Sequence, residues 1–97
     1  PLAHWRDLEK ASGIFLLDVR ETSEYAAGHV EGATNIPLSQ LRQRLGELPS
    51  DREIWMYCAV GQRAYNATRA LSQHGLKVRN LSGGYASYQM QRAVDKR

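Results

Sequence analysis

The residues best suited to covalent chemistry lie in one segment, residues 57–63, which contains the only cysteine of the 97-residue chain. A cysteine attacks electrophiles as its thiolate, and nearby N–H donors and positive charges favour that form. Gly61 gives the backbone freedom to curl around the sulfur, so the following amides can point inward, and Arg63 adds a guanidinium. We interpret the segment as an active-site loop with a nucleophile and a binding cradle, formed by Cys58, then Ala59, Val60, Gly61, Gln62 and Arg63.

The loop is expected between a strand and a helix. The apolar run Ile54–Tyr57 has strand length, and residues 64–74 repeat apolar side chains at helical spacing. The helix would direct its positive N-terminal end toward Cys58. The face predicted to be buried consists of Ala67, Ala70, Leu71 and His74.

The size of the loop bears on the group it binds. Four residues separate Cys58 from Arg63, whereas cysteine-dependent phosphatases have five and bind a tetrahedral phosphate. The smaller ring suits one extra sulfur atom, so we expect attack on a sulfane sulfur and formation of a cysteine persulfide. The alternatives are an arsenate reductase or phosphatase of the same fold, a non-catalytic protein-binding module, and a cysteine that is only a small buried hydrophobe.

Four segments in order along the chain resemble the signatures of rhodanese-type sulfurtransferases. The resemblance implies that Cys58 is catalytic and that residues 59–63 bind the transferred sulfur. The chain differs from many relatives at Ala59, where they carry Arg or Lys, and at Tyr88, where they carry Trp. The matching segments are Leu16-Leu17-Asp18-Val19-Arg20-Glu21, Gly28-His29-Val30-Glu31-Gly32-Ala33-Thr34-Asn35-Ile36-Pro37, the Cys58–Arg63 loop, and Asn80-Leu81-Ser82-Gly83-Gly84-Tyr85.

The loop and the last segment are most similar to rhodanese domains fused behind flavin-dependent coenzyme A disulfide or persulfide reductases. This resemblance implies thiosulfate or a small-thiol persulfide such as coenzyme A persulfide as donor, and a thiol as acceptor. It implies no cofactor in this domain, with FAD and coenzyme A in a fused reductase. The chain starts at Pro1 without an initiating methionine, which fits a fragment of such a fusion.

Composition predicts one globular domain over residues 1–97, with 42% apolar residues. No apolar run approaches the ~20 residues of a membrane span. The net charge of +3 is spread along the chain, which argues against nucleic-acid binding. One cysteine and three isolated histidines give no disulfide and no metal-ligand spacing. A reactive unpaired thiol favours the reducing cytoplasm.

Alternating strand and helix patterns predict an α/β fold of the rhodanese-like class, with about five parallel strands and helices on both faces. Asp18 and Arg20 should emerge at the end of a strand, where we favour a structural hydrogen-bond network over a direct role. We also assign His29 to the scaffold and predict Thr22 as the N-cap of a short helix. The remaining expected strands and helices cover residues 2–3, 5–10, 14–17, 23–27, 34–36, 38–48 and 77–81, followed by a final helix that carries Tyr85, Tyr88, Gln89 and Arg92.

Overall fold

Five short strands form one parallel sheet in the computed structural model, which describes residues 2–60 and 62–95, with residues 62, 63 and 95 described by backbone alone. The strand order is β1-β5-β4-β2-β3. Because every pairing is parallel, all five strands end at the same edge of the sheet. The strands are β1 Leu2–Ala3, β2 Phe15–Asp18, β3 Thr34–Asn35, β4 Ile54–Tyr57 and β5 Val78–Leu81.

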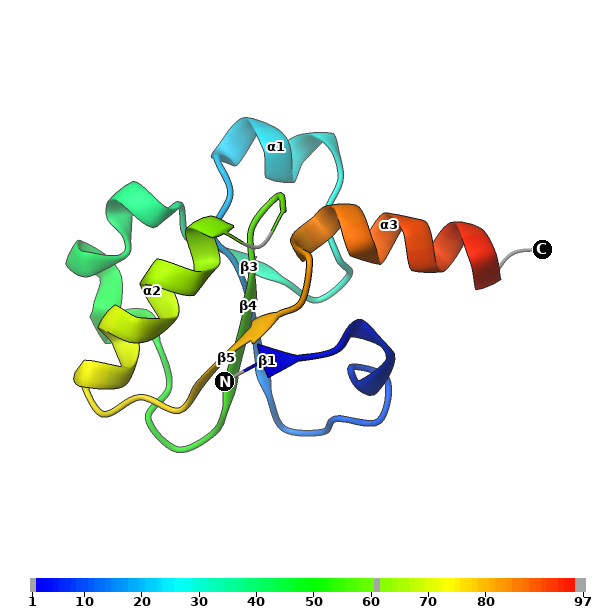
Figure 1. The fold of residues 1–97 in the computed structure, drawn as a ribbon. Helices are drawn as coiled ribbons and strands as arrows, with labels where there is room; N and C mark the ends of the chain where they lie inside the picture. The colour runs from blue at the N-terminus through cyan, green and yellow to red at the C-terminus, as the bar shows by residue number, and fades with distance from the viewer. Residues whose placement is uncertain (1, 61, 96–97) are drawn as a thin grey trace.

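Helices cover both faces of this sheet (Figure 1). One face carries α2 (Gln62–Gln73) with the 3-10 helices η2 (Leu38–Gln40) and η3 (Arg42–Glu47). The other carries η1 (Trp5–Asp7), α1 (Thr22–Ala27) and α3 (Gly84–Asp95). The predicted fold class, a five-stranded parallel sheet with helices on both faces, is confirmed.

The central strand β4 contributes to both cores because its side chains alternate between the faces. Ile54 and Met56 pack in the cluster under α2. Trp55 and Tyr57 pack in the cluster under α1 and α3. All four side chains are buried, so β4 is fixed from both sides, and Cys58 follows it directly.

Three local predictions were wrong. The leucine pattern over residues 38–48 forms η2 and η3 in place of one α-helix. The buried face of α2 includes Thr68 but not Ala70 or His74. Thr68 can be buried because its hydroxyl donates to the Ala64 carbonyl at 2.8 Å and so loses no hydrogen bond inside the core. The buried residues of this face are Ala64, Ala67, Thr68 and Leu71.

The N-cap of α1 is Glu21, and Thr22 is the first residue inside the helix. The Glu21 backbone N–H donates to the Glu24 carboxylate at 3.0 Å. This contact is half of a capping box, in which the N-cap residue pairs with the residue three positions later. Glu21 lies three positions before Glu24 and can form it, whereas Thr22 lies only two positions before and cannot.

Candidate functional site

Cys58 lies at the carboxyl edge of the sheet, directly after β4. Its side chain is fully buried and faces the first turn of α2. The Ala64 backbone N–H donates to Cys58 Sγ, with 3.3 Å between nitrogen and sulfur. An amide from the first turn of a helix is one of the groups that favour negative charge on a bound atom. The sulfur therefore lies in a dry setting with a donor directed at it.

The peptide backbone of the loop is held by the start of α3. The Tyr85 N–H donates to the Cys58 carbonyl at 2.8 Å, and the Ala86 N–H donates to the Ala59 carbonyl at 3.0 Å. These two amides belong to the first turn of α3, which has no intrahelical acceptors for them. Helix α3 is thereby joined to the first two residues of the loop.

A pair of glycines makes this approach possible. Gly83 and Gly84 both have positive φ, at 74° and 65°. A Cβ on Gly83 would collide with the Ser87 side chain. The Tyr85 bond to Cys58 places these two glycines beside the Cys58 loop.

The structure describes part of the predicted cradle. Ala59 is half-buried and Val60 is 65% exposed. Gln62 and Arg63 begin α2, and their side chains lie outside the described residues, as does Gly61. The assignment of residues 59–63 to substrate binding therefore stays a prediction. The structure adds the Ala64 amide as a donor to Cys58 that the sequence analysis did not name. Its signal was the helix start, since a first-turn amide needs an acceptor outside the helix.

Asp18 and Arg20 form a buried ion pair at the same edge. Arg20 Nη2 donates to Asp18 Oδ2 at 2.8 Å, and Arg20 Nε lies 3.1 Å from both carboxylate oxygens. Burial alone lowers the pKa of Arg20, but the hydrogen bond and the charge of Asp18 outweigh it and raise that pKa above its ordinary value. Arg20 stays protonated, and the predicted hydrogen-bond network is confirmed.

The network reaches two tyrosines. The Arg20 guanidinium carbon lies 4.1 Å from the ring centroid of Tyr85 and 5.6 Å from that of Tyr57. Arg20 Nη2 also donates to the Gly28 carbonyl at 2.6 Å. Burial raises the pKa of the Tyr57 hydroxyl, which accepts the Val30 N–H at 3.1 Å. Tyr57 is therefore a neutral scaffold group and not an acid or base near neutral pH.

His29 is exposed and contacts Tyr25 of α1. Its ring stacks on Tyr25 with 3.6 Å between centroids, and Nδ1 lies 2.8 Å from the Tyr25 carbonyl oxygen. These contacts fit the scaffold role that we predicted.

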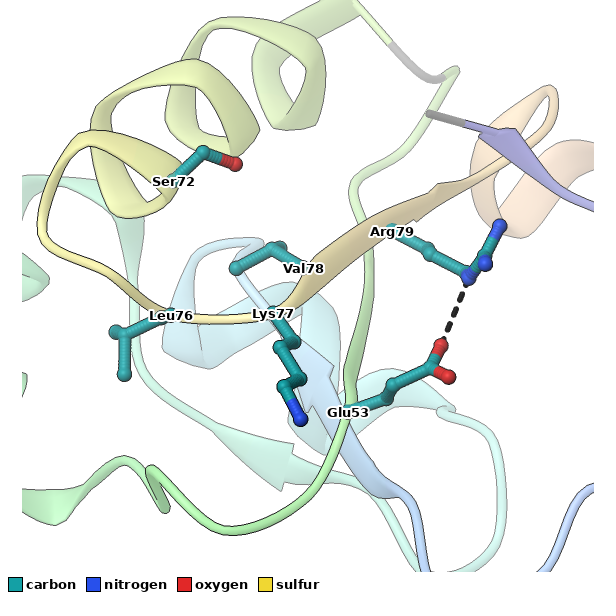
Figure 2. Close-up of a pocket in the computed structure, with 6 residues that line it drawn as sticks. All are labelled: Glu53, Ser72, Leu76, Lys77, Val78 and Arg79. Carbon is teal, nitrogen blue, oxygen red and sulfur yellow. Dashed lines mark hydrogen bonds and ion pairs between the residues drawn. The ribbon is translucent and has the colours of Figure 1, made fainter.

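A cavity of about 420 Å³ opens beside the loop. Ala59 and Val60 form one side, and Arg20 and Tyr85 contribute to another. A second cavity, of about 340 Å³, lies at the opposite edge of the sheet, where Glu53, Lys77 and Arg79 surround it (Figure 2). Cys58 is fully buried and lines neither cavity. The first cavity is formed in part by its neighbours Ala59 and Val60, so we associate the predicted chemistry with that one.

Among the described residues, 2–60 and 62–95, no helix combines the length and apolar character needed to cross a membrane. Within the same residues, no group of three or more His, Cys, Asp or Glu side chains is arranged to hold a metal ion.

Residues 3–91 match the family model of the Rhodanese-like domain. The uncharacterized protein YqhL of Bacillus subtilis is 42% identical over 74 residues, which cover 75% of this chain and 59% of that protein. A sulfurtransferase of Allochromatium vinosum is 34% identical over 82 residues, covering 84% of this chain and 77% of that protein.

Two solved structures also resemble this chain in both sequence and fold. Reduced CoADR-RHD from Bacillus anthracis is 42% identical with a TM-score of 0.78, over 87% of this chain and 15% of that chain. An NAD-dependent persulfide reductase from A. fulgidus is 42% identical with a TM-score of 0.67, over 78% of this chain and 14% of that chain. The chain thus spans only a small part of both of these larger proteins.

Proposed function

Because the chain belongs to the rhodanese-like domain family, we propose that it is a sulfurtransferase domain in which Cys58 accepts a sulfane sulfur and passes it to an acceptor thiol. The observation that carries the proposal is the buried Cys58 sulfur with the Ala64 N–H directed at it. An amide donor in a buried site stabilises charge more strongly than the same donor in solvent.

The proposed reaction has two balanced steps. With thiosulfate, the Cys58 thiolate attacks the outer sulfur, a new S–S bond forms, the old S–S bond breaks, and sulfite leaves with the electron pair. The product is the Cys58 persulfide anion. An acceptor thiolate then attacks the terminal sulfur of that persulfide and leaves with it, which regenerates the Cys58 thiolate. The chain has no second cysteine, so the acceptor thiol comes from another molecule or domain.

The role of the first helical turn follows from this chemistry. In both steps negative charge lies on Cys58 Sγ or on the sulfur attached to it. The Ala64 amide is fixed by the helix backbone, so it needs no reorganisation when that charge develops. Sulfur transfer between thiols requires no cofactor in this domain.

Intact mass spectrometry tests the proposal. The protein is incubated with thiosulfate and, separately, with a small-thiol persulfide, and Cys58→Ser is the control. We expect a gain of about 32 Da, one sulfur atom, in the wild type and none in the variant. A gain in both proteins, or in neither with either donor, would reject the proposal.

We propose further that a small-thiol persulfide is the better donor and that a flavoprotein reductase, fused or separate, receives the sulfur. The support is the 42% identity to CoADR-RHD and to a persulfide reductase, together with the nearby cavity of about 420 Å³. Rates of sulfur uptake from the two donors, compared at equal concentration, test this choice. A faster reaction with thiosulfate would reject it.

A further inference from the structure

Arg20 lies at a junction of four elements of the fold. Its backbone follows β2, its Nη2 binds the Gly28 carbonyl at the end of α1, and its guanidinium faces Tyr85 at the start of α3 and Tyr57 at the end of β4. Only 4% of the residue is exposed. An ion pair with Asp18 would need none of the other three contacts, so Arg20 does more than neutralise a carboxylate.

Tyr85 connects this junction to the nucleophile. Its ring lies against Arg20 with 4.1 Å between the guanidinium carbon and the ring centroid. Its backbone N–H donates to the Cys58 carbonyl at 2.8 Å. The same residue thus holds the guanidinium with its side chain and the nucleophile's peptide group with its main chain.

We infer that Arg20 is a positioning residue for sulfur transfer, acting through Tyr85 to fix the Cys58 peptide, and hence the sulfur, against the Ala64 amide. This inference rests on the proposed function. A hydrogen-bond donor stabilises a reacting sulfur only over a narrow range of distance and angle. A displacement of about 1 Å can lower a rate on the order of 100-fold.

The helix α3 also contains a natural control. Arg92 and Tyr88 form a second arginine–tyrosine contact, with 5.6 Å from the guanidinium carbon to the ring centroid and a 3.1 Å bond from Nη1 to the hydroxyl. Tyr88 packs on Trp5, with 5.0 Å between ring centroids. The Tyr88 ring also stacks on Tyr85, with 5.7 Å between centroids, so the control variant is Arg92→Lys. It removes an exposed guanidinium from a tyrosine ring and leaves the contacts of Tyr85 in place.

The test compares Arg20→Lys and Tyr85→Leu with Tyr85→Phe and Arg92→Lys. Arg20→Lys keeps the positive charge beside Asp18 but loses the planar group that stacks on Tyr85. Tyr85→Leu removes the ring from a half-buried position, and Tyr85→Phe keeps the ring. Sulfur uptake from thiosulfate is followed in single turnovers at rising donor concentration, and every rate is divided by the folded fraction from circular dichroism.

We expect the saturating rate to fall on the order of 10- to 100-fold in Arg20→Lys and Tyr85→Leu. The half-saturating donor concentration should stay within about 3-fold of wild type, because positioning acts on the reacting atom and not on donor binding. Tyr85→Phe and Arg92→Lys should keep the wild-type rate within about 3-fold. An unchanged saturating rate in both test variants would overturn the inference, since Arg20 would then be structural only.

A rise in the half-saturating concentration alone would also overturn it, because Arg20 would then bind the donor directly from its place in the cavity wall.

Alkylation of Cys58 by iodoacetamide separates this inference from the proposed function. It reads the position and reactivity of the sulfur without any sulfur donor. If the wild type takes up no sulfur but Arg20→Lys is alkylated more slowly than the wild type, the proposed function is rejected and the positioning role of Arg20 is retained.

Discussion

Two arginine–carboxylate pairs lie at opposite edges of the same sheet. Arg20 and Asp18 meet at 2.8 Å at the carboxyl edge, and their side chains are 5% and 0% exposed. Arg79 and Glu53 meet at 2.7 Å at the other edge (Figure 2), where the side chains are 45% and 42% exposed. The chemical groups and distances are nearly equal, so the difference between the pairs lies in their surroundings.

The two ion pairs differ in burial and in the groups that they contact. The Arg20–Asp18 pair binds the Gly28 carbonyl and lies beneath the active-site loop. In the Arg79–Glu53 pair, Glu53 also accepts a hydrogen bond from Trp55 Nε1 at 3.1 Å, and both charged side chains are exposed to solvent. A buried charge that loses its partner cannot be stabilised by water, whereas an exposed one can. We therefore expect the first pair to be indispensable and the second to be nearly neutral.

The largest effect should follow from removing one carboxylate at each edge. Asp18→Ala leaves the Arg20 guanidinium buried and unpaired, and we expect it to lower the free energy of unfolding by about 3–5 kcal/mol. Glu53→Ala leaves an exposed Arg79 and should cost about 1 kcal/mol or less. Urea unfolding at pH 7 measures both variants. Similar losses would show that burial does not distinguish the pairs.

Glycines with positive φ sharpen the same contrast. Gly83, beside the loop, has φ 74° and would place a Cβ against Ser87. Gly75, before Leu76 and Lys77 at the opposite edge, has φ 82° and open space around it. Each Gly→Ala change should cost about 1–2 kcal/mol for the backbone conformation alone.

Only Gly83→Ala adds a steric conflict, and it should also slow sulfur uptake because Gly83 leads directly into the α3 turn that holds Cys58. Urea unfolding and the mass assay are applied to both variants. If Gly75→Ala proves as costly as Gly83→Ala and slows uptake equally, the crowding at the loop edge has no consequence of its own.

The sequence predicted the elements of this fold better than the contacts between them. Apolar runs such as Ile54–Tyr57 specify buried strands by themselves, and β4 has the predicted bounds. The leucine pattern at 38–48 specified a buried face but not the helix type, since spacings of three and four suit both 3-10 and α-helical turns. Boundaries and helix type depend on tertiary packing, which a local pattern does not contain.

The candidate site divides in the same way. The single cysteine before a glycine and an arginine, together with three other segments that resemble rhodanese signatures, predicted Cys58 as the nucleophile. Its catalytic role stays a prediction until it is tested. The helix start indicated that a first-turn amide would face Cys58, but it did not identify Ala64 as the donor to the sulfur or Tyr85 as the donor to the Cys58 carbonyl, because backbone amides have no residue type that marks them. The stacking of Arg20 on Tyr85 joins residues 65 positions apart, a distance at which no periodicity operates.

The smallest effect concerns acid stability at the exposed edge. Hydrogen bonds from Trp55 and Arg79 lower the pKa of Glu53 below its ordinary value of 4.5. A carboxylate whose pKa is lowered by folding stabilises the fold above its unfolded pKa, and this contribution disappears as the pH falls through the folded pKa. Wild type should therefore exceed Glu53→Gln in unfolding free energy at pH 7, by less than about 1 kcal/mol because the pair is exposed.

The difference between wild type and Glu53→Gln should shrink as the pH falls below about 4.5, where protonation makes the wild-type side chain neutral as well. Urea unfolding of both proteins from pH 7 to pH 3 measures it, and Arg79→Met should show a weaker pH dependence than wild type because one cause of the lowered pKa is gone. A difference that stays constant to pH 3 would mean that the Glu53 charge contributes nothing. The difference in stabilisation between the two ion pairs would then be greater than we propose, because the exposed pair would contribute no electrostatic stabilisation.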